Sequence, residues 1–336
     1  MATAVRKKRG KSSPSPTIET PAASNPLISD AKLRQLYATM LRFRLLDERT
    51  RELRRLSDKT APLFRKEAAI VGAALDLRRD DWLLPLQNDL HGRLIKGVPL
   101  VSIFSELRQS KMSRTPSARQ PTLAALDRNP SPFHIVPSAA NPSAQLNLAS
   151  GIALALQAKK RGNIVMAFCG DTSDSGQRWQ EALNFAGRHC LPLLILGHAK
   201  APAKAASARK GKPFVSLLSE GNPCELPNIP VDADDVVAVY RVACESIHKA
   251  RHGGGPTLIQ AISFPMSVAG KSGPGDQHKH PDAIARMEDY LAAKRLFSSS
   301  WKQKLRDSYN RELDAAIGRD QPGSTRSSAK RPVSPN

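Results

Sequence analysis

The sequence predicts an α/β protein with a central, mostly parallel sheet flanked by helices. Two short apolar runs, Ile164–Cys169 and Leu193–Leu196, have the composition of strands that are buried on both faces. The segment Trp179–His189 between them has helical spacing, so the three pieces read as one strand–helix–strand unit. A further apolar run, Thr257–Ile262, predicts another buried strand.

The loop that follows the first predicted strand is the most informative stretch of this unit. Residues 170–176 are residue types that favour turns and helix N-caps, and they include Asp171. Parallel strands joined by a crossover helix place this loop at the carboxyl end of the sheet, where open α/β folds usually bind ligands. The carboxylate of Asp171 is therefore well placed to hold a divalent cation that bridges to phosphate oxygens.

Length and composition set the class of protein. The chain has 336 residues, of which 40% are hydrophobic, so it can bury a substantial core. No apolar run approaches the roughly 18 residues that a membrane span needs. No hydrophobic stretch follows the basic start at 6–9, which excludes a secretory signal; a mitochondrial-type presequence is the alternative to a disordered basic tail. We expect basic disordered tails at 1–25 and 318–336, one domain over 26–317, and a cytoplasmic location.

Charge and cysteine content bear on partners and redox state. The formal net charge of +21 favours polyanionic partners or an acidic protein surface. No zinc-finger, RNA-binding-sheet or helix-turn-helix signature is present, so nucleic-acid binding is not the favoured interpretation. The cysteines are far apart without a CxxC pair, which suggests neither a zinc site nor a disulfide framework; they are Cys169, Cys190, Cys224 and Cys244.

Helices are predicted on both sides of the central unit. Ser29 and Asp30 cap a long helix that runs to Leu56. Its apolar stripe consists of Leu33, Leu36, Tyr37, Met40, Leu41 and Phe43. Most of its charged residues are interpreted as a solvated face; they include Arg42, Arg44, Asp47, Glu48 and Arg49.

The remaining segments are predicted from turn residues and caps. A second helix begins at 66–74, the proline-rich stretch 108–143 reads as a loop, and Pro281–Ile317 reads as two helices. Asp232 and Asp234 are expected to cap a helix that starts near residue 235.

The stretch 162–200 resembles the thiamine-diphosphate motif in the α subunit of 2-oxo acid dehydrogenase E1 components. The motif of that family opens with Gly-Asp-Gly, and here residues 170–172 read Gly170-Asp171-Thr172. The intervening residues 181–184 (Glu-Ala-Leu-Asn) and 191–192 (Leu-Pro) also fit the family. The resemblance implies the thiamine-diphosphate-binding fold, with thiamine diphosphate and Mg²⁺ as cofactors.

The resemblance also assigns site residues. It places Gly170, Asp171 and Thr172 at the cofactor and makes Asp171 the metal ligand. His91 stands in a His-Gly pair like that of the family, which makes it a candidate cofactor-binding and catalytic residue. Lys200 stands at the close of the motif and is assigned to the cofactor site as well.

The sequence departs from the family pattern at several positions that carry chemistry. Ala199 and Lys200 stand where the motif closes with Asn-Asn, and Pro202 stands where a further metal ligand is usual. Asn88 and Asp89 replace a Tyr-Arg pair, so a carboxylate takes the place of an arginine that would meet phosphate. The catalytic loop histidine of the family has no counterpart in register, because no histidine lies between residues 252 and 278.

Two interpretations of Lys200 follow from these departures. Its ammonium group could lie opposite Asp171 and occupy the place of the cation, or Lys200 could belong to a solvated basic loop over 200–212.

The resemblance implies a homologue of an E1 α subunit, whose reaction is the oxidative decarboxylation of a 2-oxo acid with acyl transfer to lipoamide. The implied partners are an E1 β-type subunit in an α2β2 assembly and a lipoyl acyltransferase core. The substituted ligands predict weakened or lost catalysis. The alternatives are a non-catalytic structural or regulatory partner of an E1 subunit and a basic nucleic-acid-associated protein.

Overall fold

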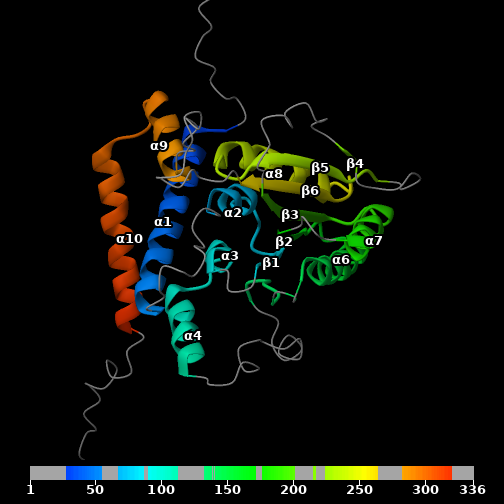
Figure 1. The fold of residues 1–336 in the computed structure, drawn as a ribbon, viewed down its shortest axis with the longest axis horizontal. Helices are drawn as coiled ribbons and strands as arrows, with labels where there is room; N and C mark the ends of the chain where they lie inside the picture. Colours follow the sequence, from blue (N-terminus) through cyan, green and yellow to red (C-terminus); the bar gives the residue numbers. More distant parts are fainter. Residues whose placement is uncertain are drawn as a thin grey trace, which may run out of the picture.

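A computed structural model gives the fold and describes residues 28–54, 67–86, 90–112, 132–137, 139, 141–171, 176–200, 215–216, 224–263 and 282–319. Its strands are β1 (Trp82–Leu84), β2 (Val165–Asp171), β3 (Leu193–Lys200), β4 (Val215–Ser216), β5 (Pro227–Asp232) and β6 (Thr257–Ser263). They form one sheet in the order β1-β2-β3-β6-β5-β4 (Figure 1). All neighbouring pairs are parallel except β4, which is antiparallel to β5. The predicted α/β class and mostly parallel sheet are confirmed.

The helices before β2 are α1 (Asp30–Arg54), α2 (Glu67–Ala74), α3 (Leu90–Ile95), α4 (Leu100–Met112) and α6 (Pro142–Ala158). Those after it are α7 (Gly176–Arg188), α8 (Val236–Arg251), α9 (Ala283–Ala293) and α10 (Ser299–Arg319). None of the helices within the described ranges is long and apolar enough to cross a membrane.

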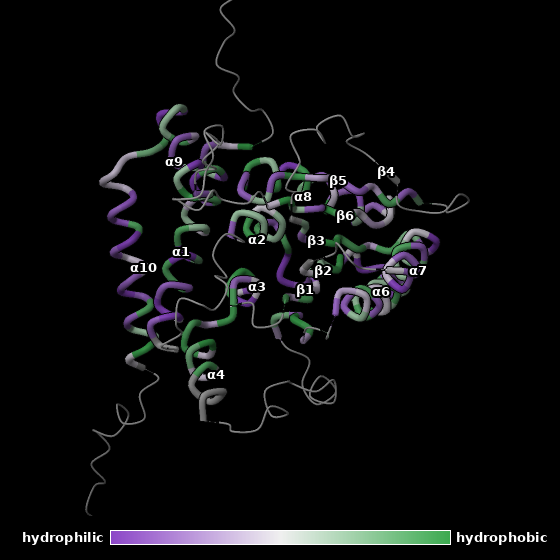
Figure 2. Tube along the Cα trace, viewed as in Figure 1, coloured by the Kyte–Doolittle hydropathy of each residue, from purple (hydrophilic) through white to green (hydrophobic). Residues whose placement is uncertain are grey.

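Each central strand buries alternate side chains in two separate cores. On β2, Val165 and Ala167 pack in the core beneath α6 and α7, whereas Met166 and Phe168 pack in the core beneath α1, α2 and α8. Figure 2 shows the hydrophobic strands at the centre, with more polar tube on the outlying helices such as α10. Burial on both faces explains why the strands read as continuous apolar runs rather than as alternating patterns.

The predicted helices are present, with corrected boundaries. All six residues of the predicted stripe on α1 are buried. Residues 108–112 belong to α4 rather than to a loop, and the loop predicted up to residue 143 ends earlier because Asn141 caps α6 and Pro142 occupies its first turn. A proline is tolerated there, since the first helical N–H has no intrahelical partner. The helix α10 ends at Arg319, two residues beyond the predicted end of the domain.

Another correction concerns the cap of α8. The N-cap residue is Asp235, whose Oδ1 accepts hydrogen bonds from the backbone N–H groups of Val237 and Ala238. Asp232 instead accepts a hydrogen bond from the backbone N–H of Asp234, which shapes the turn before the helix.

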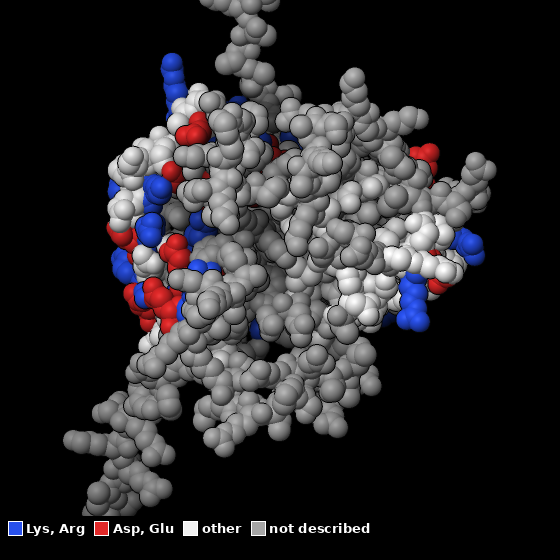
Figure 3. Space-filling view, viewed as in Figure 1, with Lys and Arg blue, Asp and Glu red and all other residues white. Residues whose placement is uncertain are grey.

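Several charged residues of α1, predicted to form a solvated face, are partly exposed and form ion pairs with α10. Arg42 forms an ion pair with Glu312 of α10, and Arg49 forms one with Asp314. Figure 3 shows acidic and basic side chains intermixed over α1 and α10. These charges therefore connect the first and last helices of the described chain.

The amino edge of the sheet holds a buried charged cluster. Asp81 is 0% exposed, and its carboxylate contacts the Arg251 guanidinium and accepts a hydrogen bond from the backbone N–H of Ile164. The ammonium group of Lys96 donates to the backbone carbonyls of Arg78, Arg79 and Asp81 at 2.6–2.9 Å. Burial lowers the pKa of Lys96 to about 8, while the charges of Asp81 and Asp80 act in the opposite direction.

A disulfide joins Cys190, in the turn before β3, to Cys224, just before β5. This corrects the expectation that the cysteines form no disulfide. The chain makes room for the bridge at Gly255, where a Cβ atom would lie 2.7 Å from Cys224 Cβ and 3.1 Å from its Sγ. Cys169 and Cys244 are free thiols.

Candidate functional site

The carboxyl ends of β2, β3 and β6 lie side by side and form the candidate site. In the register of the sheet, Asp171 at the end of β2 pairs with His198 on β3. Lys200 at the end of β3 pairs with Ser263 at the end of β6. This is the edge at which parallel α/β sheets bind ligands, so the sequence-based placement of Asp171 and Lys200 on one edge is consistent with the fold.

Gly170 allows β2 to reach this edge in its observed conformation. Its φ angle is +66°, in the left-handed region that side chains with a Cβ atom rarely adopt. A Cβ atom here would also lie 3.4 Å from Cδ2 of Leu86, and the β2–β3 register shifts between Phe168 and Gly170. The glycine therefore sets the direction of the backbone at Asp171.

The register bears on the hypothesis that Lys200 lies opposite Asp171. The residue paired with Asp171 is His198, and Lys200 lies two positions further along β3. Residues two apart on a strand share a face of the sheet, so the three positions lie on the same face. Thr172 lies outside the described residues.

The sequence-based search missed a hydrogen bond across this edge. His198 Nε2 lies 2.6 Å from Ser263 Oγ, and both residues are partly buried. The two residues are 65 positions apart in sequence and belong to no short motif. The only available signal was their position at the ends of two apolar runs, because such positions gather at one edge in a parallel sheet.

Gln145, on the first turn of α6, fixes the neighbouring strand ends. Its Nε2 donates to the backbone carbonyls of Leu84, Pro85 and Phe168 at 3.0–3.3 Å, and its Oε1 accepts a hydrogen bond from the N–H of Ala139 at 2.6 Å. The side chain is 3% exposed. A buried amide with these partners ties β1, β2 and the start of α6 together.

His91 is placed in a packing position on α3. Its ring stacks on Phe43 of α1 with a centroid separation of 4.4 Å and an interplanar angle of 8°. Its Nε2 lies 3.0 Å from Oδ1 of Asp47, also on α1, and the imidazole is buried. These contacts join α3 to α1, and the assignment of His91 to the cofactor site stays a prediction.

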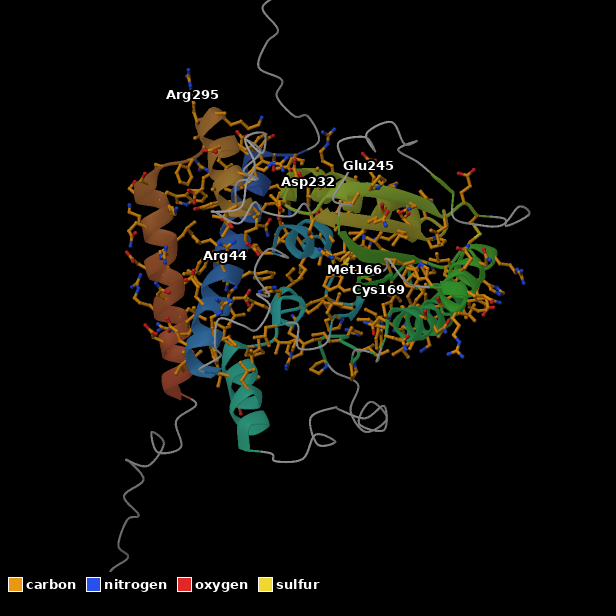
Figure 4. All side chains as sticks on the ribbon, in the orientation of Figure 1. Arg44, Met166, Cys169, Asp232, Glu245 and Arg295 are labelled. Atoms are coloured by element: carbon orange, nitrogen blue, oxygen red, sulfur yellow. A yellow bond between two sulfur atoms is a disulfide. The ribbon has the colours of Figure 1, made fainter. Side chains whose placement is uncertain are left out.

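A cluster of ion pairs lies near the carboxyl end of β5, at the same edge of the sheet. Arg44 of α1 contacts Glu67, which is 1% exposed, and its Nη2 lies 2.7 Å from Oδ1 of Asp282 at the start of α9. Burial alone would lower the pKa of Arg44, but the hydrogen bonds and charges of Asp282 and Glu67 outweigh it and raise the pKa. Asp232, at the end of β5, pairs with Arg286 at 2.5 Å; Figure 4 labels Arg44 and Asp232.

The described side chains do not fit a Mg²⁺ site at this edge. Magnesium is bound in octahedral geometry by oxygen ligands, chiefly carboxylates, phosphates and water. Beside the Asp171 position the structure places an imidazole that is hydrogen-bonded to a serine, and the neighbouring amide of Gln145 is engaged with backbone. Within the described ranges, no group of three or more His, Cys, Asp or Glu residues could hold a metal ion.

Comparison with known proteins identifies the family. The sequence model of the family described as "Dehydrogenase E1 component" matches residues 37–323. The chain is 26% identical over 264 residues to the pyruvate dehydrogenase E1 component subunit alpha of Acholeplasma laidlawii, covering 76% of this chain and 73% of the relative.

Two further relatives cover more of the chain. The corresponding pyruvate dehydrogenase subunit of Bacillus subtilis is 24% identical, over 88% of this chain and 79% of its own length. The 3-methyl-2-oxobutanoate dehydrogenase subunit alpha of Mycobacterium tuberculosis is 28% identical, over 83% and 75%. The protein belongs to the dehydrogenase E1 component family.

Proposed function

We propose that the protein is an E1 α-type subunit homologue in which thiamine-diphosphate-dependent catalysis is weakened or lost. The relatives are subunits of pyruvate and 3-methyl-2-oxobutanoate dehydrogenases, which supports a 2-oxo acid as the substrate class of the assembly. The reaction class is oxidative decarboxylation with transfer of the acyl group to lipoamide. In such an enzyme the cofactor supplies the carbanion chemistry, and the protein binds and orients it.

The observation that carries this proposal is the pairing of His198 with Ser263 beside the position of Asp171. Gly170 and Gln145 keep the shape of the edge, while the described residue that pairs with Asp171 in the sheet, His198, is not an oxygen ligand that would complete a Mg²⁺ site. The scaffold of the site is retained, while residues at the positions of cofactor ligands are changed. This combination supports a loss of cofactor binding rather than a loss of the fold.

Substitution of Lys200 tests whether this residue replaces the metal ion at the cofactor site. We infer that its ammonium group takes the place of the cation near Asp171, which removes the need for metal. A double variant, Ala199→Asn with Lys200→Asn, should gain Mg²⁺-dependent affinity for thiamine diphosphate in a calorimetric titration. Lys212→Asn is the charge-matched control in the same basic segment and should gain none. Equal behaviour of the two variants would contradict this role for Lys200.

The partner follows from the family. We propose that the chain assembles with an E1 β-type subunit in an α2β2 complex, and through it with a lipoyl acyltransferase core. Co-expression with the β-type subunit of the same organism, followed by sedimentation analysis, should give a complex larger than either chain alone. Separate sedimentation of the two chains at micromolar concentration would contradict the proposal.

The net charge of +21 is the observation behind a second candidate, a nucleic-acid-associated protein. This candidate predicts binding to DNA or RNA that weakens steeply as salt is raised. An absence of binding at low salt would remove it and leave the structural or regulatory subunit as the remaining non-catalytic role.

A further inference from the structure

Two histidines lie one turn apart at the C-terminal end of α8, His248 in its last turn and His252 as the C-cap residue, away from the strand ends of the candidate site. His248 and His252 are both exposed, and their ring centroids are 4.1 Å apart with an interplanar angle of 32°. Residues at i and i+4 occupy the same face of a helix, so both imidazoles can reach one point in solvent. A pair of imidazoles at this spacing is a common arrangement for binding transition metals.

A hydrogen bond fixes the orientation and tautomer of His252. Its Nδ1 lies 2.7 Å from the backbone carbonyl oxygen of His248. A carbonyl only accepts hydrogen bonds, so Nδ1 carries the proton and a neutral ring presents the lone pair of Nε2 outward. Metal-binding histidines usually have this arrangement, in which a backbone carbonyl holds the other ring nitrogen.

The charges around the pair are compatible with a cation. Lys249 lies between the two histidines in sequence, but its ammonium group donates to the backbone carbonyls of Glu225 and Pro256 at 3.3 and 3.0 Å. The guanidinium of Arg251 is turned to Asp81 and to the carbonyl of Gly162. The C-terminal end of a helix also carries partial negative charge, which favours a bound cation.

From this geometry we propose that His248 and His252 bind a divalent transition-metal ion of the Zn²⁺ class. Two imidazoles are suited to Zn²⁺, Cu²⁺ or Ni²⁺ rather than to Mg²⁺ or Ca²⁺, which take oxygen ligands. The two rings supply two coordination positions, and solvent supplies the others. The site lies at the amino edge of the sheet and is independent of the proposed function at the carboxyl edge.

The test is a titration of the untagged full-length protein with Zn²⁺ by calorimetry, together with NMR of the histidine ring nitrogens. The proposal predicts one site, with a shift of the Nε2 resonances of both His248 and His252. His248→Gln and His252→Gln should each weaken binding by at least about tenfold. His189→Gln, at an exposed histidine at the end of α7, should leave the affinity unchanged.

Two further variants test whether other side chains of the protein bind the Zn²⁺ ion instead. Cys244→Ser removes the exposed free thiol on the same helix, and the double variant His278→Gln with His280→Gln removes the other closely spaced histidines. Both should bind Zn²⁺ as the wild type does. The proposal is overturned if the wild type does not bind Zn²⁺, if His248→Gln binds it normally, or if either of these controls abolishes binding.

Discussion

At the scale of single residues, the candidate edge depends on a few positions whose backbone or partners are unusual. Gly170 adopts a left-handed conformation, Gln145 uses its buried amide on backbone groups, and His198 contacts Ser263. A sequence shows the glycine and its loop, but it does not show which distant residue each side chain meets.

Because Gly170 adopts a left-handed conformation, alanine at this position should change the free energy of unfolding in the opposite direction to alanine at Gly151. Gly170→Ala should lower the free energy of unfolding by about 1–2 kcal/mol, because alanine resists the left-handed φ. Gly151→Ala is the control, since Gly151 lies inside α6 with open space around its missing Cβ. This change should raise the free energy of unfolding by up to about 1 kcal/mol. Chemical denaturation measures both, and a stabilising Gly170→Ala would contradict the structure.

The buried Lys96 should make the free energy of unfolding depend on pH. Because burial lowers its pKa to about 8 in the folded protein, the unfolded chain, with a lysine pKa of about 10.4, binds more protons between these values. Its contribution to the free energy of unfolding therefore rises as the pH rises from about 8 towards 10. The difference between wild type and Lys96→Met, measured by urea denaturation across this range, isolates that slope. A fall instead would show that the three carbonyl acceptors hold the proton more strongly than burial disfavours it.

At the scale of elements, the amino edge is held by contacts that join the starts of several strands to the end of α8. Asp81 precedes β1, and its partner Arg251 ends α8. Arg251→Met should lower the free energy of unfolding by about 3–5 kcal/mol, because a fully buried carboxylate loses its counter-charge. Arg241→Met, at an exposed position on the same helix, should change it by no more than about 0.5 kcal/mol. Similar effects of the two changes in thermal or chemical denaturation would rule out this role for the pair.

The disulfide makes a second prediction at this scale. Thiol titration of the oxidised, denatured protein should find Cys169 and Cys244 free, and Cys190 and Cys224 only after reduction. With a separation of 34 residues, the bridge should contribute about 3–4 kcal/mol to the free energy of unfolding. Cys190→Ser should lose that amount under oxidising conditions, and Cys244→Ser should lose little. Four reactive thiols before reduction would show that the bridge does not form.

The elements differed in how far sequence could predict them. The buried strands β2, β3 and β6 were predictable because both faces are apolar, and α1 was predictable from its stripe. β1 has three residues and so leaves almost no periodic signal. The cap of α8 was assigned to neighbouring aspartates because three acidic residues precede the helix and composition does not choose among them.

The candidate site was predictable only in part, for a physical reason. Residues 170 and 171 stand in a local motif, so their place at the carboxyl edge follows from the order of strand, loop and helix. His198 and Ser263 meet only because β3 and β6 are neighbours in the sheet, and that pairing is long-range. The disulfide was missed for the same reason, since two cysteines 34 residues apart give no spacing signature.

At the scale of the whole molecule, the protein has the fold of the E1 component family over most of its length. The family match covers residues 37–323, which includes the sheet, most of both cores and the two last helices. The hydrophobic cores do not depend on the identity of residues at the strand ends, so the fold can persist while ligand residues change. This separation is the basis for proposing a subunit with weakened or lost cofactor chemistry.

A calorimetric titration of thiamine diphosphate with Mg²⁺ is the direct test of whether the protein has lost its cofactor chemistry. It should be made with the purified chain alone and with the chain assembled with its β-type subunit, using a catalytically active family member as the positive control. If the cofactor site is weakened or lost, the chain alone should show no Mg²⁺-dependent binding, and binding in the complex should be much weaker than in the control. Micromolar, Mg²⁺-dependent binding, with turnover of a 2-oxo acid in the complex, would contradict this loss.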